Sequence, residues 1–184
     1  MNLKSVLIVV KSLIYCSFIK VFYCRNFRFS VSNLLNTGVH FDFSRKASVK
    51  IGKRFSCRRN VQIATTDNSL LEIGDDVFIN TNSVIACHKH IVIGDNVKFG
   101  PGVYIYDHDH TYSEGKITHE YSSSDIVIDD DVWIGANCII LRDTHIGKKC
   151  VFGAGCIIKG DYCDESFVVQ KRESTIKRFE EFSN

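Results

Sequence analysis

The sequence is poor in proline and has no metal-binding cysteine pair. Proline occurs once in 184 residues, as Pro101, whereas cysteine occurs eight times. No two cysteines have the C-x-x-C spacing of a structural zinc site, and this is not a short secreted scaffold that needs disulfides. With 45% apolar and 24% charged residues, we expect one folded domain with free thiols in the reducing cytoplasm.

Acidic residues are nearly missing from the first third of the chain. Residues 1–60 contain twelve Lys and Arg against a single acid, Asp42, whereas residues 61–184 contain eleven against twenty. The two parts therefore carry net charges of +11 and −9. A basic end on an acidic body predicts an anionic partner. We expect no nucleic acid there, because no aromatic-basic RNA motif or DNA-reading helix accompanies the charge.

The apolar run over residues 5–24 has no small-residue cleavage site after it, so it is not read as a signal peptide. Lys11 and Lys20 interrupt the run, which disfavours a membrane span. A helix there could instead dock on the protein's own body or on another subunit, or lie on a membrane surface. Nearby basic residues favour the membrane surface, namely Arg25, Arg28, Arg45 and Lys46. We assign residues 1–45 to a basic helical segment; docking on the protein body or another subunit is the first interpretation, and peripheral membrane contact through residues 1–30 is the second.

Large apolar residues recur at every sixth position, a spacing that no helix produces. An i, i+2 pair on one face is strand geometry, and the residue two before each large one is apolar or small. Each hexad therefore predicts a short strand and a turn, stacked as a hexapeptide parallel β-helix. Three registers carry this signal: Ile73, Ile79, Ile85; Ile93, Phe99, Ile105; and Ile128, Ile134, Ile140, Ile146, Phe152, Ile158. A weaker match from Val49 to Ile63 extends the β-helix over residues 46–168.

Cysteine occupies the position two before a large residue at Cys138, Cys150 and Cys156, and we interpret these cysteines as compact core residues. Breaks in the register predict small loops before Ile73 and Ile93. A larger break predicts that residues 107–125 leave the coil as a polar loop, and long loops on rigid scaffolds are commonly functional.

That loop begins with Asp107, His108, Asp109 and His110. A histidine held where a rigid coil meets a loop is well placed to act as a general base near neutral pH. The same cluster could instead bind zinc or iron, or form a solvated turn. Spacing alone does not decide between these readings.

Two stretches resemble the hexapeptide-repeat acyltransferases, and within them the galactoside, maltose and polysaccharide O-acetyltransferases. They are IGDNVKFGPGVYIYDHDHTY (93–112) and IDDDVWIGANCIILRDTHIGKKCVFGAGCIIKGD (128–161). The resemblance implies an all-β fold, a left-handed parallel β-helix with one extruded loop and an N-terminal helical segment. It also implies a homotrimer that uses acetyl-CoA as co-substrate and needs no metal.

The resemblance also assigns site residues. The family's catalytic His matches His108, with His110 as the runner-up, and its acceptor-site Asn matches Asn80. Three further residues are expected at the acceptor: Asn82, Asp107 and Trp133. Turn positions expected along the cofactor groove between subunits are Gly100, Ala136, Gly153 and Ala154.

The C-terminal segment departs from the family, because residues 168–179 lack its Gly-x-Pro motif. We expect residues 169–184 to form a basic, helical tail. Its cations are expected to meet the phosphates of CoA, and include Lys171, Arg172 and Lys177.

The predicted reaction is direct acetyl transfer from acetyl-CoA to a hydroxyl of a sugar or surface-glycan intermediate. His108 takes the hydroxyl proton, and a turn N–H at Gly100 or Ala136 stabilises the oxyanion. Asp107, Asp109 or Glu120 could orient the imidazole. The alternatives are a non-catalytic β-helix scaffold and an enzyme with an amino-sugar or amino-acid acceptor.

Overall fold

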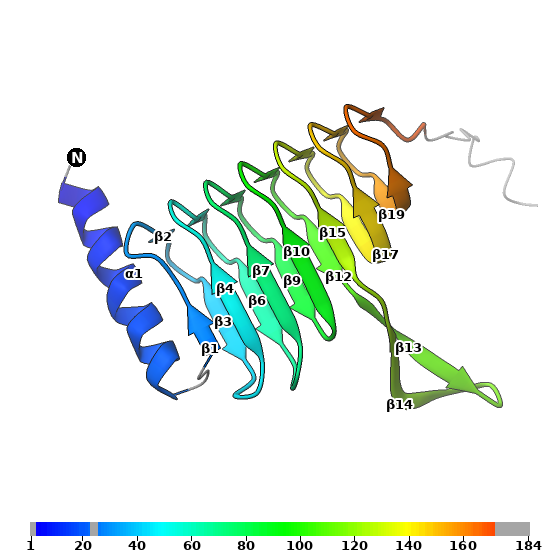
Figure 1. The fold of residues 1–184 in the computed structure, drawn as a ribbon, viewed down its shortest axis with the longest axis horizontal. Helices are drawn as coiled ribbons and strands as arrows, with labels where there is room; N and C mark the ends of the chain where they lie inside the picture. Colours follow the sequence, from blue (N-terminus) through cyan, green and yellow to red (C-terminus); the bar gives the residue numbers. More distant parts are fainter. Residues whose placement is uncertain (1–2, 23–25, 172–184) are drawn as a thin grey trace, which may run out of the picture.

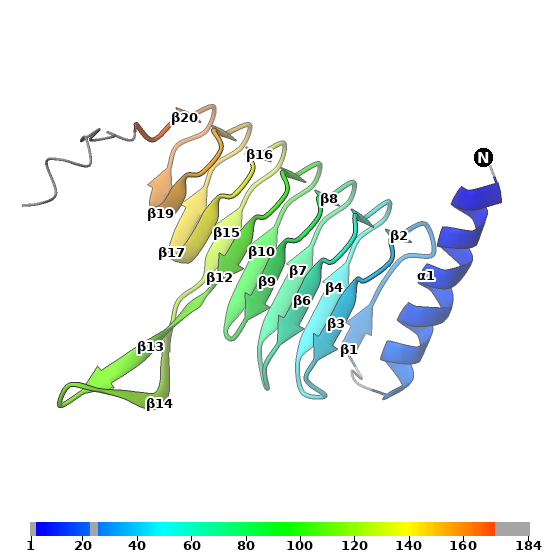
Figure 2. The same ribbon diagram turned by 180° about the vertical axis from the view of Figure 1, so that it is seen from behind.

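The chain is described by a computed structural model that covers residues 3–22 and 26–171 (Figure 1). A helix, α1 (Leu3–Phe22), lies across one end of a parallel β-helix that occupies almost all of the rest. The strands stack coil upon coil along the molecule, and Figure 2 shows the same stack from behind. The prediction of a hexapeptide-type parallel β-helix with an N-terminal helix is confirmed.

Each coil has three faces, and every strand on these faces pairs in parallel with the strand one coil away. The first face contains β1 (Asn26–Arg28), β4 (Ser48–Ile51), β7 (Leu70–Ile73), β10 (His90–Ile93) and β15 (Ile126–Ile128). The second face contains β2 (Leu34–Leu35), β5 (Ser56–Cys57), β8 (Phe78–Ile79), β11 (Lys98–Phe99), β16 (Trp133–Ile134), β18 (Val151–Phe152) and β20 (Phe167–Val168). The third face contains β3 (His40–Phe43), β6 (Gln62–Thr65), β9 (Val84–Cys87) and β12 (Tyr104–Tyr106). Two longer strands run from the third face into the first: β17 (Ile139–Ile146) and β19 (Ile157–Tyr162).

The core is the pair of inward rows that the repeat predicts. None of the large residues in the three registers, and none of the residues two before them, is more than 3% exposed. Cys138, Cys150 and Cys156 are fully buried among them, as predicted. Because each coil places its inward residues directly over those of the previous coil, the rows form one continuous apolar column.

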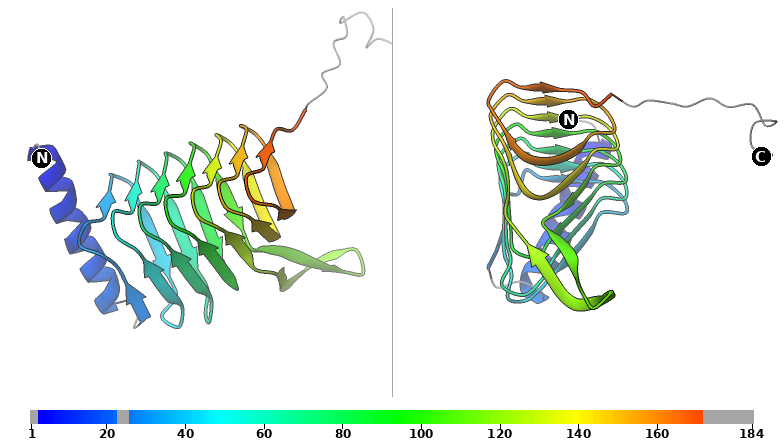
Figure 3. Two further views of the ribbon diagram at one scale, coloured as in Figure 1. Left: turned by 45° about the horizontal axis from the view of Figure 1, so that its top comes forward. Right: turned by 90° about the vertical axis from the view of Figure 1, so that its right-hand side faces the viewer.

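Breaks in the repeat all fall at one edge, where the third face meets the first; we call it the loop edge. At this edge the first two coils turn over four residues each, 44–47 and 66–69, and the next coil turns over two, 88–89. Residues 107–125 leave the coil at the same edge as an antiparallel hairpin of β13 (His108–Ser113) and β14 (Lys116–Ser123). The hairpin projects beyond the stack (Figure 3). The predicted excursion is therefore present, but as paired strands rather than as an irregular loop.

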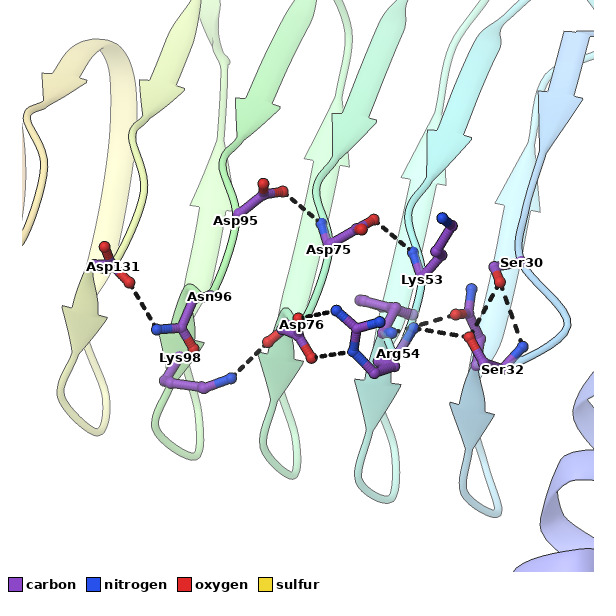
Figure 4. A network of polar contacts seen from close by, with 12 residues as sticks. Ser30, Ser32, Lys53, Arg54, Asp75, Asp76, Asp95, Asn96, Lys98 and Asp131 are labelled. Atoms are coloured by element: carbon purple, nitrogen blue, oxygen red, sulfur yellow. Dashed lines mark hydrogen bonds and ion pairs between the residues drawn. The ribbon is translucent and has the colours of Figure 1, made fainter.

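The edge between the first and second faces carries a ladder of carboxylates (Figure 4). Asp75 accepts a hydrogen bond from the backbone N–H of Lys53 at 2.8 Å, and Asp95 accepts from the N–H of Asp75 at 2.7 Å. Asp130 continues the ladder by accepting from the N–H of Asp95 at 2.9 Å. One side chain per coil thus satisfies a turn amide that has no strand partner.

The domain boundary lies earlier than the sequence reading placed it. The helical segment expected over residues 1–45 ends at Phe22, and the β-helix expected from residue 46 begins at Asn26. Residues 26–43 form a complete coil, and its buried phenylalanines are Phe27, Phe41 and Phe43. Of the tail expected to be helical over residues 169–184, residues 169–171 are described and form no helix, and residues 172–184 lie outside the described residues.

The helix closes the end of the first coil. The N–H of Leu35 donates to the Ser12 hydroxyl at 2.8 Å, and the N–H of Phe41 donates to the Tyr15 hydroxyl at 3.0 Å. Cys16 is buried against the same coil. Because the terminal coil of a β-helix has unpaired amides on its outer side, these hydroxyls replace the missing strand partners. The structure describes no helix that is long and apolar enough to cross a membrane.

Candidate functional site

The base of the hairpin is organised around the buried carboxylate of Asp107. Its side chain is fully shielded from solvent and accepts backbone N–H groups of the adjacent coil: His88 at 2.8 Å, Lys89 at 2.7 Å and His90 at 3.0 Å. His88 and Lys89 form the shortest turn of the loop edge, and His90 is the first residue of β10. Several N–H groups that converge on one carboxylate fix its orientation.

His108 donates a fourth hydrogen bond to the same carboxylate. Its Nδ1 lies 3.1 Å from Oδ1 of Asp107. Since an ionised carboxylate only accepts, Nδ1 carries the proton, and neutral imidazole then has its lone pair on Nε2. Among the described residues, no partner occupies that Nε2. The imidazole is therefore held in the tautomer that a general base requires.

The plane of the His108 ring is fixed by aromatic neighbours. The ring of His88 stacks on it, with centroids 3.4 Å apart and planes 8° from parallel. Tyr121, from β14, packs edge-on against both rings at 5.3 Å and 4.7 Å. Burial, followed by the charge of His108, lowers the pKa of His88. His88 thus acts as a neutral stacking partner near pH 7.

The other polar residues of the loop have different partners. Asp109 accepts a hydrogen bond from Nε of Arg142 at 2.7 Å. His110 is exposed and packs on Tyr121 at 4.7 Å. The side chain of Glu120 is exposed on the hairpin. Of the three acids that could orient His108, the structure brings Asp107 to its ring. The described residues contain no group of three His, Cys, Asp or Glu side chains arranged to hold a metal ion.

The predicted cofactor residues lie at a second edge, where the second face meets the third; we call it the turn edge. Asn80, Gly100, Gly135 and Gly153 occupy one position in successive coils, each donating its N–H to a carbonyl of the next. A Cβ atom on Gly100 would lie 2.7 Å from the backbone nitrogen of Ala136, so only glycine fits there. The structure therefore stacks five predicted residues in one narrow column: Asn80, Gly100, Ala136, Gly153 and Ala154.

Two further predicted residues flank this column. Asn82 adopts a left-handed conformation, φ 59°, and its amide oxygen accepts from Nδ2 of Asn60 at 3.2 Å. That conformation favours Asn and Gly, so the turn itself accounts for the residue type. Trp133 projects from β16 on the second face and is 57% exposed. Such exposure is unusual for tryptophan and leaves the indole available for contact.

The structure does not bring His108 and Asn80 together within one chain. The third face, with the four-residue strand β9, separates the loop edge from the turn edge. At the rise of a β-strand that separation is about 13 Å. Lys171 follows β20 at the far end of the stack and is exposed. Arg172 and Lys177 lie outside the described residues.

Sequence reasoning missed His88 and Tyr121. His88 lies within the eight-residue spacing from Ile85 to Ile93, which is two residues longer than the repeat, and that break is the signal that places it at the loop edge under His108. No feature of the sequence predicts the position of Tyr121, because that position depends on the pairing of His110 with Tyr121 in the hairpin.

Two sequence models of repeat families match the chain. The model described as bacterial transferase hexapeptide (six repeats) matches residues 125–160, and the one described as hexapeptide repeat of succinyl-transferase matches residues 71–107. These stretches contain the turn edge and Asp107, and His108 lies between them. They define the fold as that of the hexapeptide-repeat transferases.

Relatives narrow the assignment. A probable acetyltransferase of Mycobacterium tuberculosis is 29% identical over 96% of this chain and 63% of its own length. The galactoside O-acetyltransferase of Lactococcus lactis is 32% identical over 51% of this chain and 46% of its own length. The chain therefore spans less than two thirds of either relative.

A hexapeptide-repeat acetyltransferase of Vibrio cholerae, solved with acetyl-CoA, is 28% identical and superposes with a TM-score of 0.50. That match covers 73% of this chain and 67% of the other. The chain is therefore similar to the hexapeptide-repeat acetyltransferases, in agreement with the resemblance noted in the sequence.

Proposed function

We propose that the protein transfers an acetyl group from acetyl-CoA to a hydroxyl of a sugar or surface-glycan intermediate, with His108 as general base. The observation that carries the proposal is the Asp107–His108 pair, in which a buried carboxylate fixes Nδ1 and leaves Nε2 available. The galactoside activity named for one relative supports a sugar hydroxyl as acceptor, and the acetyl-CoA complex of another supports the donor.

The chemistry needs no covalent enzyme intermediate. Nε2 of His108 removes the hydroxyl proton as that oxygen attacks the thioester carbonyl, and the tetrahedral intermediate then expels CoA as the C–S bond breaks. The imidazolium returns its proton to the leaving sulfur. Asp107 stabilises the imidazolium by charge and by the Nδ1 bond. Cys87, the nearest thiol in sequence, is buried, and burial raises its pKa, so it is a poor nucleophile.

The donor is proposed to lie along the turn edge. Glycine and alanine at Gly100, Ala136, Gly153 and Ala154 leave the backbone uncovered, which allows the pantetheine arm to approach closely. A backbone N–H of a turn, at Gly100 or Ala136, is the proposed oxyanion donor. Lys171, at the end of the stack, is placed to meet the phosphates.

The separation of the two edges supports a site that a second chain completes. We propose that the active unit is a homotrimer, in which His108 from the loop edge of one copy faces Asn80 at the turn edge and Trp133 on the second face of the next. Closed threefold symmetry repeats this contact three times, so all three sites are equivalent.

Subunit mixing tests this arrangement. His108→Ala and Asn80→Ala are each expected to inactivate the protein alone, whereas co-expression in equal amounts should restore about one quarter of the wild-type sites. A mixture of two His108→Ala preparations is the control and should stay inactive. Failure of the mixture to regain activity would show that the two residues do not act in a site shared between chains.

The acceptor is tested by a donor and acceptor screen. Acetyl-CoA is offered with galactosides, nucleotide sugars, amino sugars and amino acids, and both CoA release and the acetylated product are measured. The proposal predicts an O-acetylated sugar. Transfer only to amines would replace the hydroxyl acceptor, and absence of turnover with every acceptor would favour a non-catalytic scaffold.

A further inference from the structure

The helix α1 has two apolar faces on opposite sides. One side packs on the first coil and contains the buried residues Ser12, Cys16 and Ile19. The other side points away from the coil, and its side chains are between 47% and 76% exposed: Leu7, Val10, Ile14, Phe18 and Val21. We call these five residues the outer stripe. At 100° per residue they lie within one third of the helix circumference, so they form a continuous ridge.

One lysine lies on each side of the outer stripe. Lys11 lies roughly 60° from the centre of the stripe and Lys20 roughly 120° from it in the opposite direction. Both are exposed, and neither forms an ion pair with any described residue. The sequence alone left Lys20 unexplained, because it falls opposite Lys11. The structure explains the pair, since two lysines divide the face that packs on the coil from the face that does not.

We infer that the outer stripe docks on the surface of an anionic lipid bilayer, with the helix lying in the plane of the interface. An apolar ridge between lysines is the pattern of an interfacial helix, in which the apolar side chains enter the headgroup boundary and the ammonium groups extend to phosphates. The neighbouring first coil adds the exposed cation Arg28. Asp42 is the single acid between residues 1 and 60.

The positive charge around α1 disfavours a second copy of the chain as the partner that binds the outer stripe. Two such ends facing each other would bring together two sets of lysines with almost no acids between them, which is repulsive at any ordinary ionic strength. A bilayer containing anionic lipid instead complements the lysines and accepts the apolar ridge.

The position of the helix favours a flat docking surface. α1 lies across the end of the stack, roughly perpendicular to the direction in which coils add (Figure 3). In the proposed homotrimer, all three helices would face the same side and bind the bilayer together. This part of the argument rests on the proposed function, whereas the two faces of α1 do not.

Vesicle flotation of the full chain tests the inference. Phosphatidylglycerol–phosphatidylcholine vesicles are compared with phosphatidylcholine alone, and we expect binding mainly to the first. Ile14→Glu/Val21→Glu should abolish it, because charge enters the ridge. Lys11→Gln/Lys20→Gln should weaken it by at least about fivefold per lysine on anionic vesicles. The matched control, Ile117→Glu/Phe167→Glu, changes exposed apolar residues away from α1 and should bind as wild type does.

Folding and association are followed in the same samples by thermal melting and by size-exclusion chromatography. Equal flotation of the wild type and Ile14→Glu/Val21→Glu would overturn the inference, as would absence of wild-type binding to anionic vesicles. A smaller assembly for Ile14→Glu/Val21→Glu, without vesicle binding by the wild type, would show instead that the outer stripe joins copies of the chain. Because flotation does not depend on His108, failure here leaves acetyl transfer untouched.

Discussion

Replacement of Asp107 by asparagine tests the link between the buried carboxylate and the imidazole. In the wild type, Oδ2 accepts the N–H groups of Lys89 and His90, while Oδ1 accepts the N–H of His88 and Nδ1–H of His108. Asparagine has one oxygen and one NH₂ group in the same shape. It can therefore satisfy one of these two pairs of donors, but not both.

The cost follows from which pair is kept. If the amide oxygen stays with His88 and His108, the backbone N–H groups of Lys89 and His90 lose a charged acceptor. This loss should destabilise the fold by about 3–6 kcal/mol, at about 1.5–3 kcal/mol for each bond. If the amide oxygen stays with Lys89 and His90, its NH₂ group donates to Nδ1 of His108. The proton of the imidazole then moves to Nε2, which can no longer act as a base, and we expect kcat to fall about a hundred- to ten-thousand-fold.

The assay is CoA release from acetyl-CoA with the acceptor that the screen identifies, accompanied by urea unfolding. Asp109→Asn is the matched control, because its carboxylate is exposed and bonds Arg142 instead of His108, and it should retain activity. In a His108→Ala background, Asp107→Asn should lower kcat no further, since the two act as a unit. A folded Asp107→Asn protein with wild-type kcat would refute the reasoning.

Three further outcomes are expected. His88→Ala should lower kcat about tenfold by releasing the stacked His108 ring, whereas His88→Phe should preserve it; equal kinetics for both variants would exclude a stacking role. The pKa of Asp130 is lowered by the N–H of Asp95 and by Lys148, so its contribution to stability is complete above about pH 4 and is lost as the pH falls further. The melting temperature should therefore fall more steeply between about pH 5 and pH 3 for the wild type than for Asp130→Asn. An equal fall for both proteins would contradict a stabilising role of Asp130 in the carboxylate ladder. Ile134→Ala should cost about 2–5 kcal/mol in urea unfolding, because Ile134 is fully buried between Phe99 and Phe152; a loss under about 1 kcal/mol would contradict a packed column.

The repeat could be predicted because it is a local and strictly periodic signal. Each inward position depends only on its own hexad, so Ile128 to Ile158 could be placed without knowledge of the rest. The first coil was missed although Leu35 and Phe41 keep the spacing of six, because the polar Asn33 occupies an inward position of that coil and a helix takes the place of a neighbouring coil.

The candidate site was predicted in its parts but not in its assembly. His108 and the glycine turns stand out in the sequence, and the structure gathers them at two edges. The acid that orients His108 could not be chosen from Asp107, Asp109 and Glu120, because the choice depends on the turn at residues 88–89 in the coil below. His88 was missed for the same reason, since stacking between coils is a contact across nineteen or more residues of intervening sequence.

The most direct test of the central claim is acetyl transfer by the wild type and His108→Ala, measured as CoA release together with the acetylated sugar. We expect the wild type to form an acetyl ester on the sugar, and His108→Ala to lose at least about a hundredfold in kcat with an unchanged melting temperature. A folded His108→Ala protein that transfers acetyl groups at the wild-type rate would contradict the assignment of the base.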